Sequence, residues 1–126
     1  MEKKKILIVD DEEHVLIILE NRLVNAGYTV IKATNGGDAI NLAKKEIPAL
    51  IITDVSMPDI DGGGLTAALA DDRTTKDIPI LYLTALLRKE EEKERRVVLG
   101  RHFIAKPYDP EELLREVAKL ISGPQV

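Results

Sequence analysis

The sequence predicts an α/β fold in which helices cover both faces of a parallel sheet. Five short apolar runs alternate along the 126 residues with segments that carry apolar residues at helical spacing. Such alternation is typical of parallel strands joined by right-handed helical crossovers. Four of the runs also end at, or just before, a carboxylate, hydroxyl or ammonium group. In open parallel sheets ligands bind beside the carboxyl ends of the strands, so these polar groups predict a functional edge.

The first half of the chain predicts three strands and two helices. The strands are short and rich in β-branched residues, as in a sheet buried on both faces. Gly27 can end the first helix, and Pro48 lies just beyond the second. We expect strands at 6–9, 28–33 and 49–53 and helices at 12–26 and 35–46.

The second half continues the alternation. We expect helices at 62–73 and 109–121 and strands at 78–83 and 102–105. The last helix has Pro110 in its first turn, with Glu111 and Glu112 suited to the positive helix end. Residues 88–96 are nine successive charged residues where the alternation requires a fourth helix. They suit a solvated helix held by i,i+4 ion pairs, or a charged docking face.

Composition excludes several functional classes. The chain has no cysteine, which removes disulfides, thiolate metal sites and cysteine nucleophiles. A net charge of −4 argues against a nucleic-acid-binding surface. No apolar run approaches the roughly 18 residues of a membrane span, and no signal peptide is recognisable. We therefore expect a cytoplasmic protein made of one domain over residues 1–126, with its core at 4–121 and no effector domain.

The polar groups at the strand ends predict a magnesium-dependent site. Asp10 and Asp11 end the first run, Asp54 follows the third, Thr84 follows the fourth and Lys106 follows the fifth. Each residue alone has an ordinary explanation as a helix cap, strand residue or solvated amine. Together at one sheet edge, however, the carboxylates would repel one another without a cation. Hard oxygen ligands of this kind suit Mg²⁺.

Four blocks in fixed order resemble the receiver domain of response regulators in two-component signalling. They are the sequences from Ile6 to Glu12, from Ile51 to Gly62, from Ile78 to Ala85 and from Phe103 to Tyr108. The resemblance runs from residue 4 to 121. It implies a flavodoxin-like, doubly wound sheet of five parallel strands in the order 2-1-3-4-5, with five flanking helices.

The resemblance also implies a role for each strand-end residue. Asp54 would be the nucleophile and phosphoacceptor, and Thr84 and Lys106 would hold the phosphoryl oxygens. Mg²⁺ would bind Asp11, Asp54 and the backbone carbonyl of Ser56, with Asp10 acting mainly through a coordinated water. The protein would not be an enzyme in the usual sense, because it would catalyse only its own phosphorylation and dephosphorylation.

The implied partners are proteins. A sensor histidine kinase or a phosphotransfer protein would donate the phosphoryl group, and a downstream protein would recognise a surface switched by Thr84 and Phe103. The sequence names neither partner, and it leaves open whether the phosphorylated form pairs as a homodimer. His14, the lone histidine of the first helix, is interpreted as a surface residue.

Three other functional classes fit parts of the pattern. A magnesium-dependent phosphohydrolase with an aspartate nucleophile typically has a second acid two residues later, where this chain has Ser56. A flavodoxin would have a phosphate loop rich in serine and threonine in place of Asp10 and Asp11. A phosphorylation-independent pseudo-receiver would lack one of the five strand-end residues, and all five are present.

Overall fold

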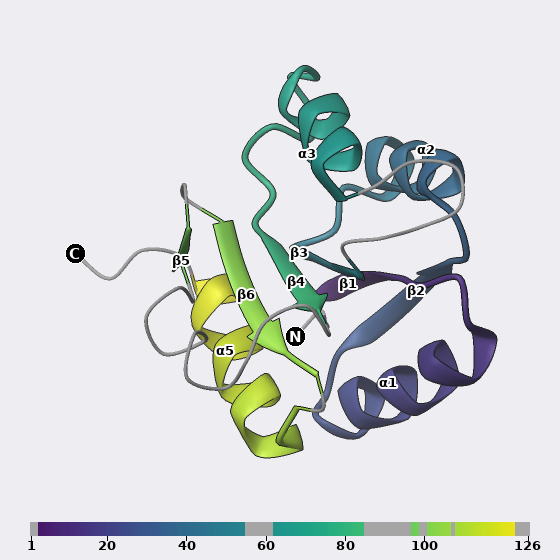
Figure 1. The fold of residues 1–126 in the computed structure, drawn as a ribbon. Coiled ribbons are helices and arrows are strands. Elements are labelled where there is room, and N and C mark those ends of the chain that lie inside the picture. The colour runs from purple at the N-terminus through teal and green to yellow at the C-terminus, as the bar shows by residue number, and fades with distance from the viewer. Residues whose placement is uncertain (1–2, 55–61, 85–96, 99–100, 107, 123–126) are drawn as a thin grey trace.

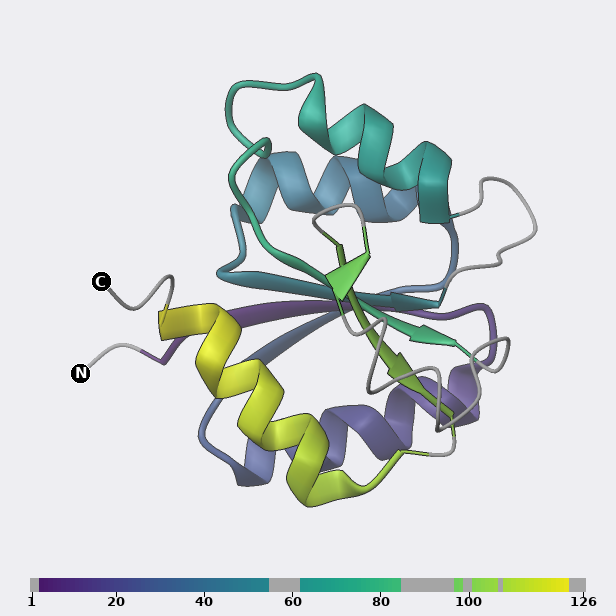
Figure 2. The ribbon, with the colours of Figure 1, turned by 60° about the vertical axis from the view of Figure 1, so that its left-hand side comes forward.

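The apolar runs of the sequence form one twisted sheet between two layers of helices (Figures 1 and 2). The structure, a computed structural model, describes residues 3–54, 62–84, 97–98, 101–106 and 108–122. Its strands are β1 (Lys5–Val9), β2 (Thr29–Ala33), β3 (Leu50–Asp54), β4 (Ile80–Thr84), β5 (Val97–Val98) and β6 (Arg101–Ala105). Its helices are α1 (Glu13–Asn25), α2 (Gly36–Glu46), α3 (Gly62–Ala70) and α5 (Pro110–Ser122).

The strand order confirms the predicted topology. Across the sheet the order is β2-β1-β3-β4-β6-β5, and the first five of these strands are all parallel. Numbered by themselves, those five strands follow the expected order 2-1-3-4-5. The two-residue β5 was not among the predicted strands. It pairs antiparallel to β6, with Val97 opposite His102. The expected helix over residues 88–96 lies outside the described residues.

Two apolar clusters fill the space on either side of the sheet. One cluster packs α1 and α5 against β1, β3, β4 and β6, with Leu19 and Val117 among its buried members. The other packs α2 and α3 against the opposite face, with Ala43 and Leu65 among its members. Figure 2 shows this arrangement edge-on, with α2 and α3 above the sheet and α1 and α5 below. None of the described helices is long and apolar enough to cross a membrane.

Local signals in the sequence set the helix ends. Gly27 adopts a φ of 102° just after α1, a conformation that few other residues tolerate. The side chain of Asn35 caps α2 by accepting a hydrogen bond from the backbone N–H of Asp38 at 2.8 Å. Helix α3 ends at Ala70, earlier than the predicted residue 73, and the carboxylate of Asp72 then accepts hydrogen bonds from the N–H and hydroxyl of Thr74.

The end of α2 contains a strained residue. Ile47 follows the helix in the left-handed conformation, with a φ of 46° and a ψ of 64°. A β-branched residue rarely adopts this conformation, and such strain costs about 1–3 kcal/mol. Ile47 is 48% exposed, so only about half of the residue is buried in return.

We predict that Ile47→Asn raises the free energy of unfolding by about 1 kcal/mol, because asparagine tolerates the left-handed conformation. Urea unfolding followed by circular dichroism measures the change. The matched control is Ile17→Asn, which replaces an isoleucine that is 52% exposed within the regular helix α1. That control should not gain stability. An unchanged or lower stability of Ile47→Asn would contradict the strain.

Candidate functional site

The polar groups predicted from the strand ends meet at one edge of the sheet. Asp10 directly follows β1, Asp54 is the last residue of β3, Thr84 is the last of β4 and Lys106 directly follows β6. The register aligns these ends, because Val9 pairs with Thr53, Asp54 with Leu83 and Thr84 with Ala105. Short parallel strands of equal length therefore bring residues that are far apart in the sequence to the same place.

Lys106 joins two of the predicted carboxylates. Its ammonium Nζ donates a hydrogen bond to Oδ2 of Asp54 at 3.0 Å and lies 3.5 Å from Oδ2 of Asp10. The three side chains are partly or largely buried, with 25%, 23% and 7% of the Lys106, Asp54 and Asp10 side chains exposed. An ion pair that is partly shielded from water is stronger than a surface pair.

Burial and the neighbouring opposite charges act in opposite directions on the pKa values of Asp10 and Lys106. Burial raises the pKa of Asp10, although a hydrogen bond from the backbone N–H of Glu12 at 2.9 Å and the charge of Lys106 partly offset the rise. Burial alone would lower the pKa of Lys106, but the hydrogen bond and charge of Asp54, with the charge of Asp10, outweigh it and raise the pKa. Lys106 therefore stays a cation at neutral pH.

The carboxylate oxygens of the candidate site are of the kind that Mg²⁺ prefers, although the described side chains do not already converge as a complete set of metal ligands. Asp10 and Asp54 supply carboxylate oxygens beside a single ammonium group, while the side chain of Asp11 is exposed. No three histidine or carboxylate side chains of the described residues converge as metal ligands. Ser56 lies outside the described residues.

The predicted switch residues lie on neighbouring strands. Thr84 pairs with Ala105, which places its backbone at the edge that carries Asp54 and Lys106. Phe103 is half-buried, and its ring stacks on that of Tyr82 with centroids 5.1 Å apart and an interplanar angle of 22°. The resemblance to receiver domains pointed to Phe103, but nothing in the sequence singled out Tyr82. His14 is exposed and lies 3.1 Å from the carboxylate of Glu12, in agreement with a surface role.

Two polar features of the structure were not predicted. The hydroxyl of Thr53, which is buried, donates a hydrogen bond to the backbone carbonyl of Asp54 at 2.9 Å. On the opposite face of the sheet, Nδ1 of His102 lies 3.9 Å from the carboxylate of the buried Glu116 on α5. That nitrogen is buried and has no hydrogen-bond partner among the described residues. Both features depend on packing that sequence spacing does not reveal.

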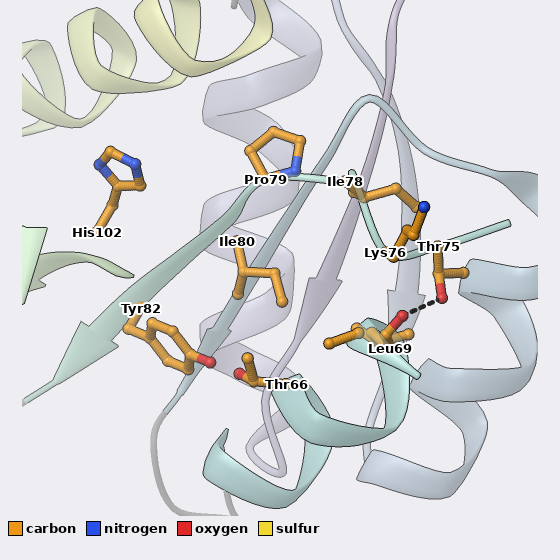
Figure 3. A pocket seen from close by; sticks show the side chains of 10 residues that line it. Thr66, Leu69, Thr75, Lys76, Ile78, Pro79, Ile80, Tyr82 and His102 are labelled. Carbon is orange, nitrogen blue, oxygen red and sulfur yellow. Dashed lines mark hydrogen bonds between the residues drawn. The ribbon is translucent and has the colours of Figure 1, made fainter. Parts of the chain in front are cut away.

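A cavity of about 190 Å³ lies away from this cluster, between α3 and β4 (Figure 3). Thr66, Lys76 and Tyr82 are among its lining residues, whereas Asp10, Asp54 and Lys106 are not. Figure 3 shows the hydroxyl of Thr75 bonded to the carbonyl of Leu69 at one side of the cavity. The charged cluster at the strand ends is the candidate site, because it combines partly buried carboxylates with an ammonium group that is hydrogen-bonded to one of them.

Comparison with known proteins agrees with this geometry. The sequence profile of the response regulator receiver domain matches residues 6–118. Protein PilH of Pseudomonas aeruginosa is 33% identical over 119 residues, which cover 94% of this chain and 98% of PilH. The "Probable transcriptional regulator ycf27" of Porphyra purpurea is 38% identical over 120 residues, which cover 95% of this chain and 48% of that protein. The chain thus spans about half the length of several curated relatives that it matches.

Comparison with solved structures supports the same family. The structure of the chemotaxis protein CheY4 of Vibrio cholerae superposes with a TM-score of 0.81 at 32% sequence identity, covering 94% of this chain and 99% of that one. The fold, the family profile and the curated relatives therefore agree. The chain belongs to the response regulator receiver domain family.

Proposed function

We propose that this receiver domain accepts a phosphoryl group on Asp54 and thereby switches a surface for protein partners. The observation that carries the proposal is the hydrogen bond of 3.0 Å between Lys106 Nζ and Asp54 Oδ2, beside the buried Asp10. It holds a carboxylate nucleophile next to a cation that can neutralise a transferred phosphoryl group. The donor would be the phosphohistidine of a sensor kinase or phosphotransfer protein.

The residues of the chain suit this reaction. An oxygen of Asp54 attacks the phosphorus atom as the P–N bond to the donor imidazole breaks, and the bonding electrons leave with the imidazole nitrogen. The transition state is loose, with charge spread over the equatorial oxygens of the phosphoryl group. Positioning and charge stabilisation therefore supply most of the catalysis, and Lys106 already faces the attacking carboxylate.

Asp10, Asp11 and Asp54 would hold Mg²⁺ together with the backbone carbonyl of Ser56. When bound, the cation supplies charge stabilisation for the transferred group. The acyl phosphate brings about −2 charge to the edge that had held a single carboxylate of Asp54. Thr84 would then bond the phosphoryl oxygens, and the change would reach Phe103 on the neighbouring strand.

The proposed output is a protein contact. A downstream protein would recognise the surface beside Phe103, and nucleic acid and membrane are not expected to bind directly. Pairing of the phosphorylated form as a homodimer stays open. The proposed location is the cytoplasm. That residues 1–126 form a single receiver domain with its core at 4–121 stays a prediction.

We predict that acetyl phosphate and Mg²⁺ add one phosphoryl group to the protein and that Asp54→Asn abolishes the labelling. An amide is neither a nucleophile nor an anionic ligand. Intact-mass spectrometry counts the added groups, and lability to base identifies an acyl phosphate. The exposed Asp77→Asn is the control and should label like the unmodified protein. Labelling of Asp54→Asn at a comparable rate would exclude this acceptor.

We predict that Lys106→Met binds Mg²⁺ about tenfold more tightly, a difference of about 1.4 kcal/mol, because the ammonium competes with the cation for the same carboxylates. The variant should also accept phosphate more slowly. Isothermal titration calorimetry measures the affinity. Lys106→Arg keeps the charge and should bind Mg²⁺ about as tightly as the unmodified protein. Weaker binding by Lys106→Met would show that Lys106 does not oppose the cation.

We predict that the Phe103 ring leaves its stack on Tyr82 when beryllofluoride and Mg²⁺ bind at Asp54, because Thr84 moves toward the phosphoryl mimic and frees space for an inward turn. Nuclear Overhauser contacts between the two rings report the stack and should weaken. In Asp54→Asn the same addition should leave them unchanged. Contacts that persist at full occupancy, with shifts confined to residues beside Asp54, would rule out this switch.

A further inference from the structure

Thr53 is a buried polar residue one position before the candidate phosphoacceptor. It is 1% exposed and lies between Val9 of β1 and Tyr82 of β4, its register partners in the sheet. Because side chains alternate along a strand, Thr53 shares the face of Ile51, which packs in the cluster with α2 and α3. Valine has nearly the same shape and would suit these apolar surroundings without a hydroxyl to satisfy.

Among the described residues, the hydroxyl of Thr53 bonds to one partner. It donates a hydrogen bond to the backbone carbonyl of Asp54 at 2.9 Å. Asp54 is the last residue of β3, so its carbonyl lies where the chain leaves the sheet. A buried hydroxyl without a partner is costly, so this bond is held firmly and it fixes the orientation of that carbonyl.

The orientation of this carbonyl bears on the Asp54 side chain. The carbonyl direction follows from the ψ angle of Asp54, and the backbone angles of a residue determine which side-chain rotamers it can adopt. The same residue places its Oδ2 atom 3.0 Å from Nζ of Lys106. The carbonyl bond from Thr53 and the carboxylate bond from Lys106 thus hold Asp54 from both its backbone and its side chain.

We propose that Thr53 is a positioning residue for the phosphoacceptor. Its hydroxyl holds the peptide after Asp54 so that the carboxylate faces Lys106 and the incoming phosphorus atom. This inference rests on the proposed phosphorylation of Asp54. Misplacement of a reacting group by a fraction of an ångström slows a reaction that depends on orientation.

The test compares Thr53→Val with Thr53→Ser. Valine keeps the shape and removes the hydroxyl, whereas serine keeps the hydroxyl and removes the methyl group. With saturating acetyl phosphate and Mg²⁺, we expect the rate constant of phosphorylation to fall about tenfold in Thr53→Val. Thr53→Ser should stay within about twofold of the unmodified protein, although it loses buried apolar contact.

A matched control separates positioning from stability. Thr75 is also 1% exposed, and its hydroxyl donates to the backbone carbonyl of Leu69 at 2.6 Å, beside the cavity in Figure 3 and away from the acceptor. Thr75→Val should lower the melting temperature and leave the rate constant of phosphorylation unchanged. If Thr53 were merely structural, Thr53→Val would phosphorylate at the normal rate whatever its melting temperature.

The outcomes distinguish this inference from the proposed function. A normal rate in Thr53→Val, while the unmodified protein is phosphorylated on Asp54, would overturn the positioning role alone. An equally slow Thr53→Ser would also overturn it, because the methyl group would then be the feature that matters. Failure of the unmodified protein to accept phosphate would overturn the proposed function and this inference with it.

Discussion

The candidate site depends on one electrostatic arrangement, in which a single ammonium group lies between two carboxylates at the edge of a parallel sheet. Lys106 reaches Asp54 at 3.0 Å and Asp10 at 3.5 Å, and burial raises the pKa of Asp10. Two acids would not stay this close without a cation, because their charges repel at low dielectric. The cluster exists only because β1, β3 and β6 end at the same level. The sheet register is therefore also the device that assembles the site.

The alternation of strands and helices and the candidate edge of the sheet followed from short-range patterns in the sequence, whereas the strand order was expected from the resemblance to receiver domains. Five β-branched runs interrupted by helical periodicity leave few topologies open, and polar residues at the strand ends mark the functional edge. Strand β5 was not predictable. Val97 and Val98 follow nine charged residues and suit a helix anchor as well as an edge strand, since two residues carry no periodicity. The hydrogen bond from Thr53 was also missed, because a threonine in a strand is ordinary until its hydroxyl is seen to have a backbone partner.

Strand β6 links the site to two other parts of the molecule. Its successive residues point to opposite faces, so His102 approaches Glu116 on α5 while Phe103 stacks on Tyr82 on the other face of the sheet. Lys106 follows the same strand into the charged cluster. A small shift of β6 would therefore act on the ion pair, on the aromatic stack and on the contact with α5 together. Under the proposed function, this connection would be a physical route by which charge added at Asp54 reaches the surface of the protein.

A few polar side chains are buried in this fold despite the free-energy cost of removing them from water. Among the described residues these are Asp10, Thr53, Thr75 and Glu116. Thr75 satisfies its hydroxyl on the carbonyl of Leu69 and closes the end of α3, which is a structural use. Asp10 and Thr53 instead flank the acceptor, one through the charge shared with Lys106 and the other through the carbonyl of Asp54. Apolar residues of similar shape would avoid the cost of burying a polar group at both positions, so the presence of Asp10 and Thr53 agrees with the proposed function of the site. Asp54 itself accepts hydrogen bonds from the hydroxyl of Thr53 on its own strand and from the ammonium of Lys106, which follows β6, so its backbone and its side chain are both held.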